Sequence, residues 1–321
     1  MSSSFDKIDY ALRPAKHTER RMLSEIFRRL WPFQLVADYV YAGFGAIAFS
    51  DFILFHRTLG VRDMVSIERN MDGIERVKEN APFNIAIDSR TSTEALPDLN
   101  WEKRHILWLD YDEALNPDML MDASIVASNA PSGTVLAISY NCHCAKELSE
   151  AKQAGEDVEA IDLFKDRFGR DRVPDTTYED DLQGWPFGTL SRKLTAVEIQ
   201  AALSVRNIHA EPDEIISFHT ICEIEYRDGA RMTTLVGIFV AEKESDKLFA
   251  CEFDSLDFLR PHQEPVRITV PLLTVKEIRK LESQLPLLNG AVLEHGQVPI
   301  ADAQRFAEFY RYLPNFAVLE G

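Results

Sequence analysis

The sequence predicts an α/β fold, built on a doubly wound and mostly parallel sheet that ends in an antiparallel hairpin. Apolar strands and amphipathic helices alternate between residues 38 and 140, which is typical of βαβ units with right-handed crossovers. A glycine turn follows the first of these strands. Two long β-rich runs, 215–226 and 231–241, are separated by a short turn sequence that predicts a hairpin. Together these segments predict seven strands.

Length and composition support an ordinary globular protein. The chain has 321 residues, of which 45% are hydrophobic and 27% charged, so disordered, collagen-like and coiled-coil classes are excluded. Its formal net charge is −17, and a surface of this sign repels phosphate backbones at long range. Duplex nucleic acid is therefore disfavoured as a partner, although a local basic strip on an acidic body would still allow it.

Cysteine usage and hydropathy indicate a cytoplasmic protein without a membrane partner. The four cysteines are expected to be reduced thiols, because the first residues lack the apolar core of a signal peptide. The longest weakly charged stretch, 35–55, carries Asp38 and Asp51, and the segment between them is too short to cross about 30 Å of hydrocarbon.

The first predicted element is an amphipathic helix over 18–30, with Thr18 as N-cap and apolar residues at helical spacing that begin at Met22. Alternating strands and helices follow, each bounded by turn residues. The predicted strands are 38–42, 63–67, 83–87, 105–109 and 134–140, and the predicted helices are 46–59, 72–79 and 118–127.

The second half begins with an acidic insertion over 145–190 that interrupts this alternation and ends in Gly184-Trp185-Pro186-Phe187-Gly188. A helix over 195–204, the hairpin strands and a segment over 267–271 follow. The last elements are a helix over 274–283, for which Thr274 and Glu277 supply a capping box, and an aromatic C-terminus over 306–316.

Candidate site residues follow from the fold, because ligands bind outside the carboxyl ends of the strands in such sheets. Glu68 is the most informative of them. An acidic residue about 20 positions beyond the glycine turn can accept hydrogen bonds from both hydroxyls of a ribose, so a nucleoside cofactor is implied. The residues at these strand ends are Tyr41, Gly43, Phe44, Gly45, Glu68, Asp88, Asp110, Tyr111 and Asp112.

These residues resemble the class I S-adenosylmethionine-dependent methyltransferases, a Rossmann-like superfamily. The resemblance rests on the turn Gly43-Phe44-Gly45, then Glu68 for the ribose and Asp88 beside the adenine, in that order. It implies S-adenosylmethionine as cofactor and methyl transfer to an oxygen or nitrogen. A dinucleotide-binding turn would require Ala48 to replace a third glycine.

A partial similarity to adenine-type amino-methyltransferases rests on Lys16 before the first helix and on the strand 39–45. That group ends its fourth strand with an acidic residue or Asn, two prolines and an aromatic residue, whereas this chain has the sequence Asp-Tyr-Asp-Glu over 110–113. The two prolines position acceptors for an amine, so their absence argues against base methylation.

The resemblance assigns roles to individual residues. Lys16 is expected to pair with the carboxylate of the cofactor's methionine part, and Asp110 to contribute to the cofactor site. Asp110 and Asp112 are the candidate catalytic residues that orient or deprotonate the acceptor, and Tyr111 lines the methyl path. No metal is expected, because Cys142-His143-Cys144 lacks the ligand spacing of zinc sites.

The interpretation divides the chain into four parts and leaves two alternatives. The parts are a helical segment over 1–34, the cofactor-binding half over 35–144, the insertion and a helix forming a lid over 145–210, and a part that completes the sheet over 211–321. The alternatives are a non-catalytic interaction or nucleotide-sensing subunit and a nicotinamide-dependent oxidoreductase. The acceptor is a small molecule or a protein, and a homo-oligomer and a complex with a protein partner both stay open.

Overall fold

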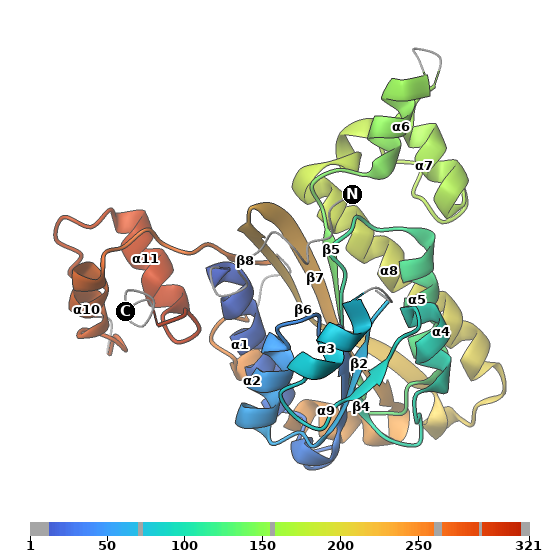
Figure 1. The fold of residues 1–321 in the computed structure, drawn as a ribbon, viewed down its shortest axis with the longest axis horizontal. Helices are drawn as coiled ribbons and strands as arrows, with labels where there is room; N and C mark the ends of the chain where they lie inside the picture. Colours follow the sequence, from blue (N-terminus) through green and yellow to red (C-terminus); the bar gives the residue numbers. More distant parts are fainter. Residues whose placement is uncertain (1–12, 70–72, 155–157, 260–264, 289–290, 316–321) are drawn as a thin grey trace.

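The fold is an eight-stranded sheet with helices on both faces, shown by a computed structural model that describes residues 13–69, 73–154, 158–259, 265–288 and 291–315. The strand order is β3-β2-β1-β4-β5-β7-β6-β8 (Figure 1). The strands are β1 Val40–Gly43, β2 Asp63–Ile67, β3 Ala86–Asp88, β4 His105–Asp110, β5 Val135–Asn141, β6 Ile216–Asp228, β7 Ala230–Ala241 and β8 Val266–Ile268.

The sheet confirms the predicted doubly wound topology and its antiparallel hairpin. Strands β1 to β5 pair in parallel, and β7 runs antiparallel between β5 and β6. The short strand β8 pairs in parallel with β6 and adds an eighth strand to the seven that the sequence predicts. The carboxyl ends of β1, β2, β4 and β5 therefore lie along one edge of the sheet, where the candidate site residues were placed.

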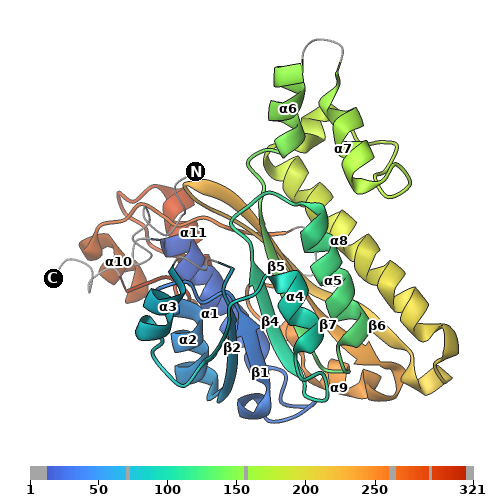
Figure 2. The same ribbon diagram turned by 45° about the vertical axis from the view of Figure 1, so that its right-hand side comes forward.

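Helices cover both faces of this sheet (Figure 2). Helices α1 and α2 lie on one face, and α5 and α8 lie on the other. The helices are α1 Pro14–Arg28, α2 Ser50–Leu59, α3 Ile74–Asn80, α4 Ser92–Ala95, α5 Pro117–Asn129, α6 Lys146–Ala154, α7 Ala160–Phe168, α8 Gly184–Arg206, α9 Ser245–Ala250, α10 Val275–Glu282 and α11 Ile300–Phe309.

Strand β4 shows how the sheet separates two hydrophobic cores. Ile106 and Trp108 are buried in the core beneath α1 and α2, whereas Leu107 and Leu109 are buried in the core beneath α5 and α8. Successive side chains of a strand point to opposite faces, so one apolar run fills both cores. The same alternation decides the face to which each site residue belongs.

Two helix starts differ from the sequence prediction. Helix α1 begins at Pro14, and Thr18 lies inside it with its hydroxyl donating to the Pro14 carbonyl at 2.8 Å. Proline suits the first helical position because it has no N–H to leave unpaired. Helix α2 begins at Ser50 instead of residue 46, because Ala46 and Phe49 have φ values of 47° and 46°, outside the helical range.

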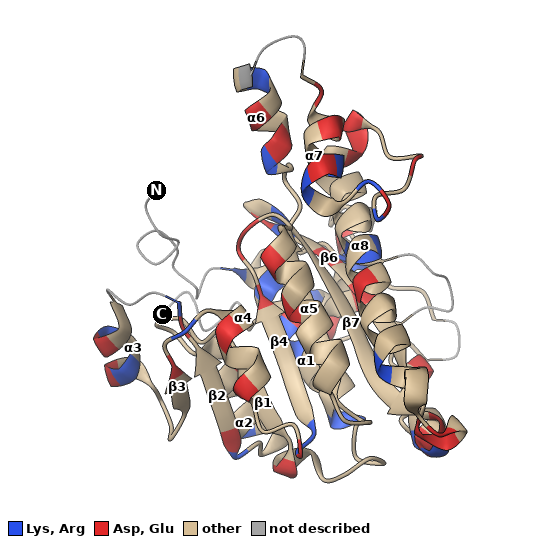
Figure 3. Ribbon diagram, turned by 90° about the vertical axis from the view of Figure 1, so that its right-hand side faces the viewer, with Lys and Arg blue, Asp and Glu red and all other residues tan. Residues whose placement is uncertain are grey.

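Helix α8 is the largest difference from the prediction. It spans Gly184–Arg206 and includes the Gly-Trp-Pro-Phe-Gly segment that the sequence analysis assigned to the end of the acidic insertion. A proline is tolerated in the first turn of a helix, where the N–H groups have no partner within the helix. Leu190, Leu194 and Leu203 are buried against the sheet. Helices α6 and α7 project from the body, and each carries two acidic and two basic residues (Figure 3).

The hairpin and the capping box form as predicted. Gly229 has a φ of 89° and lets β6 turn directly into β7, so both strands are longer than expected. Helix α10 carries the reciprocal hydrogen bonds of the capping box between Thr274 and Glu277. No helix in the described ranges is long and apolar enough to cross a membrane.

His105 should make the stability of the fold depend on pH. The side chain is fully buried at the start of β4, and burial lowers its pKa to about 4. The unfolded chain binds a proton near pH 6.5 and the folded chain does not, so stability falls as the pH drops from 6.5 to 4, by up to roughly 3 kcal/mol. Urea unfolding between pH 4 and 7.5 gives the free energy of unfolding at each pH, and this free energy should change less with pH in His105→Phe than in the wild type. The control His209→Gln, at an exposed position, should keep the wild-type pH dependence. An unchanged pH dependence in His105→Phe would contradict this role.

Candidate active site at the carboxyl edge of the sheet

The turn after β1 is shaped by two glycines that leave no room for a side chain. A Cβ on Gly43 would lie 2.9 Å from the carbonyl oxygen of Trp108, and a Cβ on Gly45 would lie 2.7 Å from the hydroxyl of Ser66. The Gly45 N–H donates to that same hydroxyl at 3.0 Å. The predicted Gly-x-Gly turn is therefore required for the close approach of β1, β2 and β4.

Glu68 lies beside this turn, at the end of β2. Its Oε1 accepts hydrogen bonds from the Ala46 N–H at 2.7 Å and from the Ser66 hydroxyl at 2.9 Å. Burial raises its pKa, against the lowering effect of these hydrogen bonds. Both of these hydrogen bonds go to Oε1, and the Gly45 backbone N–H also lowers the pKa of the carboxyl group. Glu68 thus offers a buried acceptor where a ribose was expected.

Asp88 lies one strand further along the edge and has a protein partner. The Arg90 guanidinium donates to it at 2.7 Å and 3.0 Å, and these hydrogen bonds lower the pKa of the carboxyl group. The backbone carbonyl of Asp88 accepts from the Glu68 N–H at 2.8 Å. The two predicted nucleoside-binding residues are therefore adjacent, and Arg90 fixes the orientation of the second.

Lys16 meets carboxylates, but they belong to the protein. Its side chain is fully buried, and Nζ donates to Asp110 at 2.6 Å and to Glu19 at 2.8 Å. The ammonium also lies 4.2 Å from the centre of the Trp108 ring, at cation–π distance. Lys16 therefore holds Asp110 from the α1 side, and its predicted pairing with a cofactor carboxylate would compete with these two ion pairs.

A hydrogen-bonded chain continues from this ion pair across the sheet. Thr234 on β7 donates to Glu19 and contacts the Ser139 hydroxyl at 2.8 Å, which in turn accepts from the Trp108 indole N–H at 3.0 Å. Burial raises the pKa of Glu19, while Lys16 opposes that shift. The sequence analysis did not identify Glu19, Ser139 or Thr234, because they gain their role only from contacts between distant segments.

Tyr41 and Arg20 lie beneath the glycine turn. The Tyr41 hydroxyl donates to Asp51 at the start of α2, so this predicted cofactor residue faces the core. Arg20 is 9% exposed, and its Nε has no hydrogen-bond partner in the described part of the chain. Its positive charge lowers the pKa of Asp51 and of Tyr41, although burial raises both more strongly. The sequence analysis did not identify Arg20 as a site residue.

Two of the predicted site residues, Asp110 and Tyr111, lie on opposite faces of the sheet. Asp110 points toward α1, whereas the Tyr111 hydroxyl donates to the buried Asp122 of α5 on the opposite face. The Tyr111 ring makes an edge contact with Phe44 at 5.1 Å between centroids. Burial raises the pKa of Tyr111 well above its ordinary value, so its hydroxyl stays protonated. Tyr111 therefore contacts the turn through Phe44, and its place beside the methyl path stays a prediction.

Asp112 is exposed in the loop that follows β4. Its backbone carbonyl accepts from the Asn141 side-chain amide at 3.3 Å, and the Asn141 N–H donates to the Glu113 carbonyl at 2.9 Å. The loop after β4 is thereby joined to the end of β5. Asp110 and Asp112 lie on either side of Tyr111 in the chain, but only Asp110 belongs to the buried network.

The four cysteines are free thiols. Burial raises the pKa of Cys142 to about 12, so it stays protonated and unreactive. Cys144 is exposed at the end of β5. In the ranges that the structure describes, no group of three His, Cys, Asp or Glu side chains is placed to hold a metal ion.

Comparison with known proteins identifies the family. A family described as "Putative O-methyltransferase" matches residues 8–321. The chain belongs to this O-methyltransferase family. Membership agrees with the methyltransferase interpretation of the turn and of Glu68, and it disfavours the oxidoreductase alternative. No curated protein matches the sequence.

Solved structures similar to this member of the O-methyltransferase family include two O-methyltransferases and one further complex with S-adenosyl-L-methionine. An O-methyltransferase from Bacillus cereus in complex with SAH is 14% identical over 74% of this chain and 84% of its own, with a TM-score of 0.36. TomG from Streptomyces achromogenes, in complex with SAM, is 12% identical over 73% and 92%, with a TM-score of 0.37. Trm1 from Pyrococcus horikoshii, with S-adenosyl-L-methionine, is 11% identical over 72% and 57%, with a TM-score of 0.43.

Removing the ammonium from the buried network should strongly destabilise the protein. Lys16→Met leaves Glu19 buried without its cation, which typically costs about 3–5 kcal/mol. Urea unfolding measures the loss, and the double variant Lys16→Met/Glu19→Gln should recover part of it. The control Lys78→Met breaks an exposed pair with Glu75 and should cost about 1 kcal/mol or less. Equal losses in Lys16→Met and Lys78→Met would contradict the importance of this network.

Proposed function

We propose that the protein is an S-adenosylmethionine-dependent O-methyltransferase. The observation that carries the proposal is the family match over residues 8–321, together with Glu68 and the glycine turn meeting at the carboxyl edge of the sheet. The family description favours oxygen over nitrogen as the methyl acceptor atom. The departure of the segment 110–113 from the amino-methyltransferase pattern points in the same direction.

The polar groups around the turn fit the cofactor. Glu68 Oε2 is an acceptor for the ribose hydroxyls, and Asp88 would lie beside the adenine. Arg20 Nε, which has no hydrogen-bond partner in the described part of the chain, supplies a buried donor on the α1 face of the sheet. Because Lys16 already has two carboxylate partners, we assign the methionine carboxylate of the cofactor to Arg20 in its place. Asp110, whose side chain is 24% exposed, would face the methionine part.

Bound S-adenosylmethionine supplies a methyl group on a positively charged sulfur, and the transfer leaves the neutral thioether S-adenosylhomocysteine. An acceptor hydroxyl must lose its proton as its oxygen forms the new bond to carbon. Asp110 accepts that proton in the proposed mechanism. Lys16 acts as a positioning residue, because its hydrogen bond to Oδ1 fixes the orientation of the Asp110 carboxylate.

We also place the protein in a reducing compartment such as the cytoplasm. The support is that Cys142, Cys144, Cys222 and Cys251 are all free thiols, three of them buried. Proteins of oxidising compartments more often pair such cysteines in disulfides.

Cofactor binding should depend on Glu68. Calorimetric titration with S-adenosylmethionine should give a dissociation constant at least tenfold higher for Glu68→Gln than for the wild type, about 1.4 kcal/mol. The variant should be no less stable than wild type at pH 7, because burial raises the pKa of Glu68 and its charged form opposes folding at that pH. Glu75→Gln on the exposed surface of α3 is the matched control. Binding of NAD in preference to S-adenosylmethionine would overturn the proposal.

Methyl transfer should depend on Asp110. With radiolabelled S-adenosylmethionine and the small-molecule fraction of a cell extract, Asp110→Asn should lower the rate of methyl incorporation by about 100-fold, as loss of a general base does. Asp112→Asn tests the second predicted residue. The assay is run at saturating cofactor, so that a change in binding is kept apart from a change in turnover. Full turnover in both variants would remove this loop from the mechanism.

A further inference from the structure

A second feature of the carboxyl edge is a pocket on the α8 side of the sheet, beyond the end of β5. Its volume is about 360 Å³, which is within the range of sites for small molecules. The pocket lies between α6, the loop after β5, the start of α8 and the start of β7. It is lined by His143, Cys144, Leu148, Ser149, Lys152, Gln183, Gly184 and Arg231.

The charge of this lining is opposite to that of the protein. The lining includes Arg231, Lys152 and His143 but no Asp or Glu, although the chain has 52 acidic against 35 basic residues. Neither Arg231 nor Lys152 forms an ion pair among the described residues. The Arg231 guanidinium lies 5.8 Å from the centre of the Trp185 ring and next to Gly184, where a Cβ would be 3.4 Å from Nη1. The pocket thus holds cations without protein anions to neutralise them.

Helix α6 accounts for the absence of acid in the pocket. Its carboxylates Glu147 and Glu150 both pair with Arg167 of α7, at 2.7 Å and 2.6 Å. Helical periodicity then turns Leu148 and Lys152, four residues apart, toward the pocket. The two carboxylates of α6 are therefore engaged by Arg167 of α7 and do not belong to the pocket lining.

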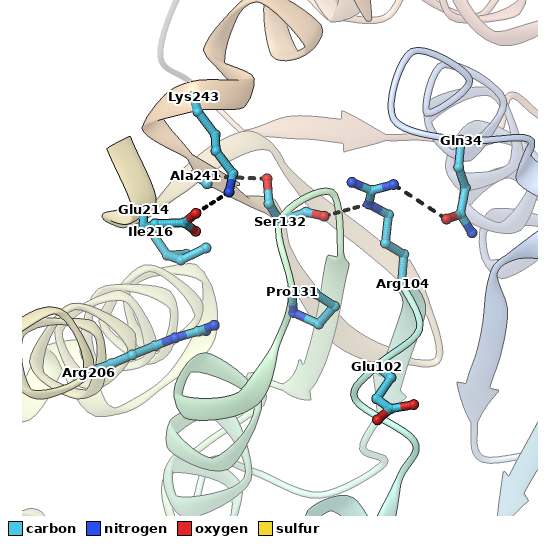
Figure 4. A pocket seen from close by; sticks show the side chains of 10 residues that line it. All are labelled: Gln34, Glu102, Arg104, Pro131, Ser132, Arg206, Glu214, Ile216, Ala241 and Lys243. Atoms are coloured by element: carbon cyan, nitrogen blue, oxygen red, sulfur yellow. Dashed lines mark hydrogen bonds and ion pairs between the residues drawn. The ribbon is translucent and has the colours of Figure 1, made fainter. Parts of the chain in front are cut away.

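A larger cavity elsewhere does not share this property. It has a volume of about 440 Å³ and lies at the amino end of β4 and β5 (Figure 4). Its cations already have partners, since Arg104 donates to the Ser132 carbonyl and to Glu244, and Lys243 pairs with Glu214. Arg206 donates to two backbone carbonyls at the end of α5. The lining also includes the carboxylates of Glu102 and Glu214, so this cavity is not purely basic.

Asn141 connects the basic pocket to the proposed reaction site. Its side-chain amide donates to the Asp112 carbonyl at 3.3 Å, and its side-chain oxygen accepts from the His143 N–H at 2.9 Å. The Cys142 N–H donates to the Arg231 carbonyl at 2.9 Å, which fixes the start of β7 beside this loop. A molecule bound in the pocket thus lies next to the loop that follows Asp110.

We propose that the acceptor is a small molecule carrying a carboxylate or phosphate group, and that Arg231 and Lys152 bind this anion in the pocket between α6 and α8. Binding the anion here orients the acceptor hydroxyl toward the edge that carries Asp110. A local cationic pocket is needed because the net charge of −17 repels anions from the rest of the surface. This inference rests on the proposed function for its acceptor role, but the anion site itself does not.

Calorimetric titrations with matched pairs of probes test the site. The charged members are 3-hydroxybenzoate and phenyl phosphate, and the neutral members are 3-hydroxybenzamide and phenol. Wild-type protein should bind at least one charged member tenfold more tightly than its neutral partner. Two pocket variants, Arg231→Gln and Lys152→Gln, should each reduce this preference at least fivefold; the Lys152 side chain is exposed, so its replacement should not disturb the fold. Lys193→Gln removes the same charge from an exposed position of α8 outside the pocket and should keep the preference.

The outcomes separate this inference from the proposed function. If the wild type shows no preference for any charged probe, or if Lys193→Gln lowers the preference as much as Lys152→Gln, the anion site is wrong. Titration with S-adenosylmethionine is carried out on the same variants and should give wild-type affinity in Arg231→Gln and Lys152→Gln. If the protein prefers the charged probes but does not bind the cofactor, the anion site is retained and the proposed methyltransferase function is overturned. If the protein binds the cofactor but does not prefer the charged probes, the proposed function is retained and the anion site is overturned.

Discussion

The buried ammonium of Lys16 is the constraint on which the carboxyl edge of the sheet depends. An ammonium in a protein core costs several kcal/mol unless carboxylates and hydrogen bonds compensate for its lost hydration. Asp110 and Glu19 provide that compensation at 2.6 Å and 2.8 Å. Asp228 at the hairpin tip accepts from the backbone N–H groups of Ala15 and Lys16, and its negative charge suits the start of a helix. Helix α1 is thereby fixed against both β4 and the hairpin.

With α1 held in this position, the two faces of the sheet carry different proposed binding sites. The α1 face carries Asp110, Arg20 and the groups proposed to hold the cofactor. The α8 face carries the basic pocket with Arg231, and it also contains Arg192, whose guanidinium pairs with the fully buried Glu225 at 3.1 Å. Each face therefore has a buried ion pair that joins a helix to the strands. The loop residue Asn141 links the two faces at the edge where the acceptor and the methyl donor would meet.

Much of the fold was predictable because it depends on local patterns. Strand β2 occupies the predicted residues 63–67, and the capping box of α10 forms as its residues indicate. The starts of α1 and α8 were placed too late, since Pro14 in α1, and Gly184 and Pro186 in α8, are compatible with a loop and with a first helical turn. Tertiary packing selects between them: Ala15 and Phe187 are buried in the two cores, so their segments gain apolar contacts as helix.

The sequence by itself determined the doubly wound fold class and the loops that share the carboxyl edge, because hydrophobic periodicity and turn residues act over short distances along the chain. Only the tertiary structure decided which side chains meet there. Lys16 and Asp110 are 94 residues apart, and Glu19 and Thr234 are 215 apart, so no local pattern encodes their contacts. The division of Asp110 and Tyr111 between the two faces follows from strand alternation. The partners of the two residues follow only from the tertiary structure, in which α1 supplies Lys16 to Asp110 and α5 supplies Asp122 to Tyr111.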